Sequence, residues 1–154
     1  MEDGLRKEFE RLQKTHGLDQ FQTYNDEFEI ETIEETSYLL RAIRRKMMDR
    51  FEYYSDILEQ LISGDSTIRN LFEYSHLTEA DKKEMFELYK ALMILQRDAA
   101  ITALSCDEKQ EGRYCKEALK AWVSLRPRLG AQVRKMRDSW SKDASANEAT
   151  GYFG

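Results

Sequence analysis

Residues 32–62 decide the fold, and they read TIEETSYLLRAIRRKMMDRFEYYSDILEQLI. Apolar side chains recur here at steps of three and four residues, the spacing that places them on one face of an α-helix. The stripe consists of Leu40, Ile43, Met47, Tyr54, Ile57 and Leu61. Thr32 and Glu35 have the spacing of a capping box, which satisfies free backbone N–H groups at a helix start. Gly64 follows and suits the left-handed conformation that ends many helices. The stretch therefore predicts one uninterrupted amphipathic helix from Thr32 to Ile62.

A second long helix is predicted from Thr78 to about Leu104. Thr78 and Asp81 repeat the capping-box spacing, with aspartate in place of glutamate. The apolar stripe that follows consists of Met85, Leu88, Leu92, Leu95 and Ala99. Helices of this length are stabilised mainly by burying such a stripe, so we expect the two long helices to pack together.

Shorter elements complete the pattern. Leu5, Phe9 and Leu12 indicate a first helix that ends near Gly17. Residues 18–30 mix helical and alternating spacing, which predicts a partly helical or extended connector carrying aromatic side chains. A short helix is expected to carry Ile68, Leu71 and Phe72, with Asp65 or Ser66 as its cap.

The last third of the chain predicts two helices separated at Arg126-Pro127. Asp107 can cap the first of them, which carries Tyr114, Ala118, Leu119, Trp122 and Leu125. The residue before a proline avoids helical geometry, and proline itself suits the first turn of a helix. The second helix carries Leu129, Val133, Met136 and Trp140.

The predicted fold class is all-α: a single-domain helical bundle of about five to seven helices with two long central helices. The bundle is expected over 1–141, followed by a flexible tail over 142–154. The tail carries Tyr152-Phe153, which suits either a short docking motif or a disordered end. Apolar residues make up 41% of the chain and cluster periodically, which argues against global disorder. No apolar run approaches the ~20 residues of a membrane span. Two cysteines are too few for a disulfide scaffold, so we expect a cytoplasmic protein.

Charge is distributed unevenly along the chain. The net charge is −5, but residues 1–37 hold eleven acidic and four basic residues, whereas 116–142 hold two acidic and eight basic residues. Such asymmetry indicates either an anionic partner or contact between the two ends of the chain. The sequence leaves both open.

Two basic clusters are candidate partner-binding or phosphate-binding sites. Arg41, Arg44 and Arg45 are expected to lie opposite the apolar stripe of the long helix and to form a solvent-facing patch. The second cluster consists of Arg126, Arg128, Arg134, Lys135 and Arg137. The alternative is that both clusters are ordinary solvated helix faces.

Catalytic and metal motifs are weakly represented. The two histidines, His16 and His76, lie in no serine, cysteine or metalloprotease motif. Glu73 and His76 form one Glu-x-x-His, whereas a di-iron bundle uses two such motifs and two further glutamates. No glycine-rich phosphate loop is present. We therefore predict no cofactor and a non-enzymatic protein.

The runs YNDEFEI (24–30) and LLRAIRRKM (39–47) resemble a pattern found in small uncharacterised archaeal proteins. The resemblance implies an all-helical, cytoplasmic, prokaryotic-type protein, and it transfers no functional residues.

The expected function is protein–protein interaction or adaptor activity with a partner protein that the sequence does not identify. The alternative is an RNA- or DNA-associated module that binds phosphate through its basic helical faces. Self-association into a homo-oligomer is also left open, because the acidic front and basic back could meet between copies.

Overall fold

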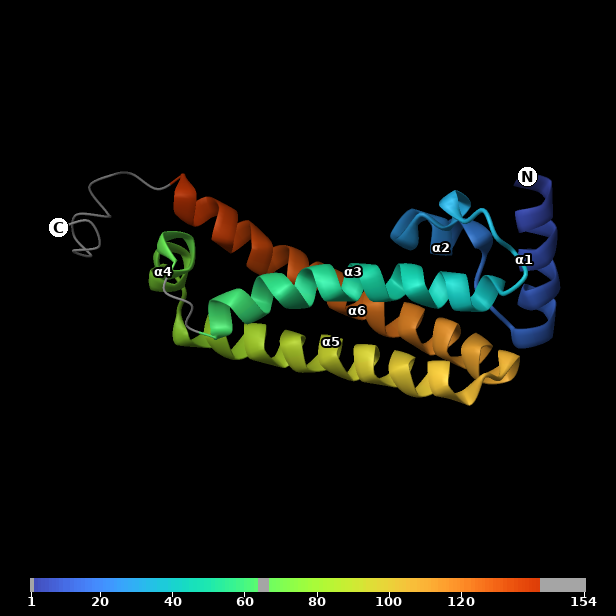
Figure 1. Ribbon diagram of the computed structural model, residues 1–154. Coiled ribbons are helices and arrows are strands. Elements are labelled where there is room, and N and C mark those ends of the chain that lie inside the picture. Colours follow the sequence, from blue (N-terminus) through green and yellow to red (C-terminus); the bar gives the residue numbers. More distant parts are fainter. Residues whose placement is uncertain (1, 64–66, 142–154) are drawn as a thin grey trace. The chain divides into compact units, whose positions relative to one another are not determined.

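The computed structural model describes residues 2–63 and 67–141, and this part of the chain is all-α (Figure 1). Its elements are α1 (Glu2–His16), α2 (Phe21–Phe28), the 3₁₀ turn η1 (Ile30–Thr32), α3 (Leu39–Ile62), α4 (Ile68–Ser75), α5 (Glu79–Ser105) and α6 (Glu108–Trp140). The predicted helical bundle is confirmed. None of the helices in the described part is both long enough and apolar enough to cross a bilayer.

The contacts of the chain cluster in two compact units. Unit 1 contains residues up to 53 together with 92–124, and unit 2 contains 54–91 together with the residues from 125 onward. The long helices α3, α5 and α6 each contribute one part to either unit. The predicted domain over 1–141 stays a prediction. The expected roles of Gly64, Asp65, Ser66 and the tail over 142–154, with Tyr152-Phe153, lie outside the described residues.

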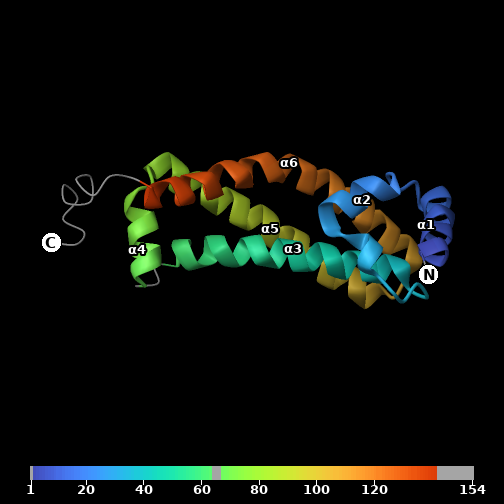
Figure 2. The ribbon, with the colours of Figure 1, turned by 90° about the horizontal axis from the view of Figure 1, so that it is seen from above.

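In unit 1, α1 and α2 cover the ends of α3 and α6 (Figures 1 and 2). The predicted stripe of α1, Leu5, Phe9 and Leu12, is buried. The connector over 18–30 contains α2 and leads into η1. Glu29 is left-handed, with φ of 55°, and lets the chain turn between these two elements. Tyr24, Phe28 and Ile30 are thereby buried.

Aromatic rings fill the core of unit 1. Phe28 and Phe51 meet edge to face with ring centroids 6.0 Å apart, and Trp122 lies 5.5 Å from Phe51. The polar ends of the rings are satisfied, because Trp122 Nε1 donates to Glu27 Oε2 at 2.7 Å and Tyr24 Oη donates to the Cys115 carbonyl at 3.1 Å. Burial raises the pKa of the Tyr24 hydroxyl and of the Cys115 thiol.

The predicted start of the long helix was wrong. Helix α3 begins at Leu39, not at Thr32. The Thr32 hydroxyl donates to the Glu29 carbonyl at 2.7 Å, so it closes η1 instead of capping α3. Glu35 accepts from the backbone N–H and the hydroxyl of Ser37. The buried stripe also differs, because Phe51 and Leu58 are fully buried whereas the predicted Tyr54 and Ile57 are only half-buried.

Unit 2 contains the capping box that was predicted correctly. The Thr78 backbone N–H donates to Asp81 and the Asp81 backbone N–H donates to the Thr78 hydroxyl, both at 3.1 Å. The start of α4 differs from the expectation. Thr67, rather than Asp65 or Ser66, caps this helix by accepting from the Asn70 N–H at 3.3 Å.

The predicted boundary at Arg126-Pro127 was also wrong, because α6 continues through Pro127 to Trp140. Proline removes the hydrogen bond to the carbonyl four residues earlier, which belongs to Val123. Both Pro127 and Val123 are exposed, so water can solvate that carbonyl. Burial of Leu125 and Leu129 on the opposite face stabilises the continuous helix. The longest helix of the described part is therefore α6.

Candidate functional site

The first half of α6 carries a stripe of four basic side chains. Lys109, Arg113, Lys116 and Lys120 are spaced by four, three and four residues, which places them on one face of the helix. All four are exposed. The opposite face of the same segment is buried and includes Tyr114, Cys115, Ala118, Leu119 and Trp122. Packing of that apolar face therefore fixes the direction of the basic stripe.

The stripe forms one side of a groove of about 680 Å³, here called the basic groove. Thr15 and His16, at the end of α1, also line it. Glu117 is the one acidic residue in the lining. None of the four basic side chains forms an ion pair with another residue of the described part. With four basic side chains and one acidic side chain in its lining, the groove presents net positive charge to solvent.

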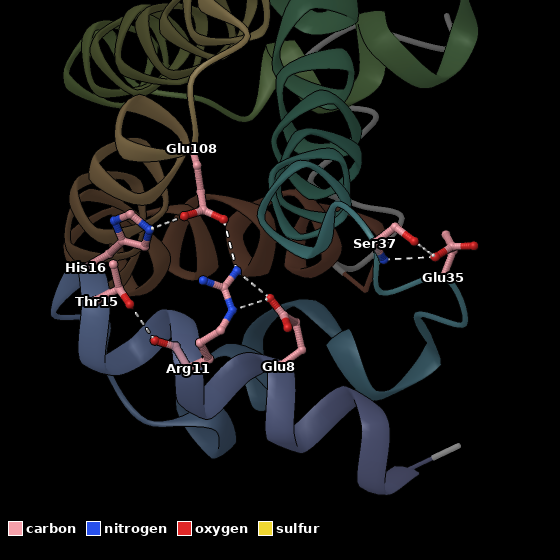
Figure 3. Close-up of polar contacts among 7 residues, drawn as sticks. All are labelled: Glu8, Arg11, Thr15, His16, Glu35, Ser37 and Glu108. Carbon is pink, nitrogen blue, oxygen red and sulfur yellow. Dashed lines mark hydrogen bonds and ion pairs between the residues drawn. The ribbon is translucent and has the colours of Figure 1, made fainter.

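A polar network joins α1, whose end lines the basic groove, to α6 (Figure 3). Glu108 contacts His16 Nε2 at 3.1 Å through one carboxylate oxygen and accepts from Arg11 Nη2 at 3.0 Å through the other. Arg11 also donates to Glu8 at 2.6 Å. The Arg11 guanidinium, and after it His16, hold the pKa of Glu108 below its usual range.

Two glycines shape the junction of α1 and α6: Gly112 permits their close approach, and Gly17 ends α1. A Cβ on Gly112 would lie 2.7 Å from Cγ of the His16 ring, so any larger residue would displace that ring. Gly17 ends α1 in the left-handed conformation, with φ of 68°. A Cβ at Gly17 would lie 3.6 Å from Lys116 Nζ, so this ammonium is close to the C-terminus of α1.

The sequence-predicted patch on α3 is only partly exposed. Arg44 is 8% exposed, and its Nε donates to Glu111 Oε2 at 2.8 Å in the interior of unit 1. The expectation that Arg44 faces solvent was wrong, because position 44 lies one turn beyond Leu40 on the same face. Arg45 is exposed, whereas Arg41 is half-buried with its guanidinium 4.5 Å from the centroid of the Tyr38 ring.

The C-terminal basic cluster belongs to unit 2, and its side chains are exposed. Arg128 forms an ion pair with Glu84, Lys135 with Asp81, and Arg137 with Asp138. Arg126 and Arg134 lie on the same helix as these three residues. The structure thus divides the predicted basic residues between the two units and pairs several of them with acids.

His76 makes local contacts, unlike His16, which contacts the distant Glu108. His76 Nδ1 lies 2.9 Å from the Phe72 carbonyl, and its ring lies 4.6 Å from the Phe72 ring. In the described part of the chain, no group of three His, Cys, Asp or Glu side chains is placed to hold a metal ion, and Glu73 belongs to no such group.

A second surface feature lies on α5. Ile94, Ile101 and Leu104 are 62%, 65% and 85% exposed, respectively. We call these three residues the α5 outer face. They lie on one side of the helix, within unit 1. The other side of the same segment, Leu92, Leu95 and Ala99, is buried.

Sequence reasoning missed both surfaces, although their signals were present. The basic stripe follows the 4-3-4 spacing of a helix face. The charge count over 116–142 included Lys116 and Lys120 but left out Lys109 and Arg113, so the four residues were not recognised as one stripe. The exposure of the α5 outer face was not predicted, because the sequence of a helix that is apolar on both sides resembles that of a central core helix.

Comparison of the chain with protein-family models, with curated proteins and with solved structures gives no match.

Proposed function

We propose that this protein is a non-enzymatic interaction module that docks a partner protein on the α5 outer face. The observation that carries the proposal is the high exposure of Ile94, Ile101 and Leu104. Apolar residues that gather on an exposed surface often mark a protein-binding site. A cytoplasmic setting is part of the proposal, since Cys106 and Cys115 are both free thiols.

The proposed occupant is an amphipathic helix of the partner. The α5 outer face extends over eleven residues, or about 15 Å along the helix axis, which suits recognition of one apolar helix stripe. Arg97 lies between Ile94 and Ile101 in the helical spacing, is exposed, and forms no ion pair with the described residues. We therefore expect a carboxylate of the partner helix to lie opposite Arg97.

A permanent homodimer through this face is less well supported. Standard stable interfaces bury about 800 Å² on each partner. Three aliphatic side chains provide only part of that area, so a transient complex fits better. Self-association is consequently an outcome that the experiment must detect.

The test places a photoreactive amino acid at position 101 and captures its crosslinked products from native lysate. We expect a defined protein whose crosslinked peptide is amphipathic and carries an acid. Ile94→Glu should abolish the crosslink, whereas Val123→Glu, an equivalent change at an exposed apolar position on α6, should leave it intact. Crosslinking only to a second copy of this chain, or equal loss in both variants, would contradict the proposal.

A further inference from the structure

We propose that the basic groove binds successive phosphate groups of a chain-like ligand. This site shares no residue with the α5 outer face, so either proposal can fail alone. Lys109 and Lys120 are eleven residues apart on α6, which separates them by about 16 Å along the helix axis. A single phosphate cannot contact all four basic side chains over that distance, whereas consecutive phosphates can.

Unfavourable local charge supports a binding role for the stripe. Lys109 and Arg113, Arg113 and Lys116, and Lys116 and Lys120 are like-charged neighbours at helical spacing, which destabilises a helix. Three other cations do pair with an acid one turn away: Arg11 with Glu8, Lys82 with Glu79, and Lys90 with Glu87. Glu117 lies one turn from Arg113 and from Lys120, yet it forms no ion pair with either of them. Residues that oppose local stability without a compensating contact are expected at functional sites.

The lining favours phosphates over nucleobases. No Phe, Tyr or Trp is present among the residues that line the groove, so it offers no aromatic ring of that kind for base stacking. Contacts to phosphate carry no sequence information. Recognition in the groove is therefore expected to follow the phosphate backbone and to be independent of base sequence.

The groove is also preformed. The His16 ring packs against Gly112, and the ion pairs of Glu108 and Arg11 hold α1 beside α6 (Figure 3). The C-terminus of α1 carries partial negative charge, which offsets part of the repulsion around Lys116. The two helices that frame the groove are therefore held together before a ligand binds, and only the basic side chains have to become ordered.

Isothermal titration with inorganic polyphosphate and with a single-stranded oligothymidylate tests the proposal and separates the two sources of phosphate. Four phosphate contacts to a single strand predict a slope of about −2.8 for log affinity against log salt. The affinity should consequently fall roughly 50-fold between about 50 and 200 mM salt.

Matched double variants assign the binding to the groove. Lys116→Gln/Lys120→Gln should weaken binding about tenfold or more and halve the salt slope. Arg134→Gln/Arg137→Gln removes the same charge from the C-terminal cluster and should leave affinity within about twofold. All four positions are exposed, and circular dichroism verifies that both variants keep their helix content.

The binding results with the two probes either support or overturn the proposed phosphate site. Binding of both probes supports the site and includes nucleic-acid backbone among its ligands, whereas binding of polyphosphate alone supports it with free polyphosphate as the source. No saturable binding of either probe would overturn the proposal. Equal weakening by the two double variants, or competition by polyglutamate as strong as that by polyphosphate, would also overturn it.

Discussion

At the scale of single residues, two positions on α6 determine how α1 and α3 pack against it. Gly112 is required because the His16 ring occupies the space of a side chain. Glu111 is required because Arg44 would otherwise be a buried charge without a partner. Neither requirement is visible in a helical stripe, because each depends on a residue that is distant in sequence.

Gly112→Ala is expected to destabilise the protein by about 1–3 kcal/mol, the usual cost of overpacking. Gly130→Ala is the matched control on the same helix, where a Cβ would come no closer than 3.4 Å to the flexible Arg134 guanidinium. That variant should gain about 0.5–1 kcal/mol from helix propensity. Urea unfolding of both variants measures the difference, and equal effects would contradict the described packing of His16.

Glu111→Ala is expected to cost about 3–5 kcal/mol, because it leaves the Arg44 charge buried and unpaired. The double variant Arg44→Met/Glu111→Leu should recover most of that loss, since apolar replacement of a buried pair is often neutral. Recovery is favoured here because Glu111 Oε1 lacks a hydrogen-bond partner in the described part of the protein. Denaturant titration of both variants gives the comparison, and a loss in the double variant as large as that in the single one would argue against the pairing.

At the scale of elements, the positions of the helices were more predictable than their ends. The Thr78–Asp81 box formed as expected, whereas Thr32 and Glu35, with the same spacing, did not cap α3. The difference is tertiary, because burial of Ile30 and the left-handed Glu29 fix η1 at the place where that helix start was expected. Local spacing also predicted a break at Pro127, but burial of Leu125 and Leu129 outweighs one lost hydrogen bond.

Pro127→Ala tests the continuity of α6. Proline in a helix interior is less favourable than alanine by about 3 kcal/mol, so the variant should be more stable by up to that amount. A helix that began at Pro127 would gain little, because proline is well accommodated in a first turn. Thermal and denaturant unfolding therefore distinguish a continuous helix from two helices.

The Asp81 carboxylate at the start of α5 makes the stability of the fold depend on pH. Its pKa is lowered chiefly by the hydrogen bond from Lys135 and further by Thr78. A carboxylate with a depressed pKa stabilises the folded state above its unfolded pKa, about 3.9, and this contribution is lost as pH falls through the lower folded value. Asp81→Asn should therefore reduce stability at neutral pH by about 0.5–2 kcal/mol and flatten its decline below about pH 4. A parallel decline in both proteins would contradict this assignment.

At the scale of the whole molecule, the sequence predicted the fold class but not which basic side chains form ion pairs. The basic C-terminal region has acidic neighbours on α5, because Arg128 and Lys135 pair with Glu84 and Asp81. The acidic N-terminal region contributes Glu8 to the network around Arg11. Charge totals over chain segments could not show which cations remain unpaired, since ion pairs join residues distant in sequence. The spacing of both surfaces is present in the sequence, but the groove beside α1 and the exposure of the α5 outer face follow from the packing.

Docking of an acidic amphipathic helix on the α5 outer face, as we propose, can be tested by a charge-swap cycle. The peptide crosslinked at position 101 is synthesised, and its affinity is measured for the wild-type chain and for Arg97→Glu. We expect Arg97→Glu to bind the peptide more weakly by about tenfold or more, with recovery when the peptide's acid is replaced by lysine. Unchanged affinity of Arg97→Glu, or no recovery with the lysine peptide, would contradict the proposal.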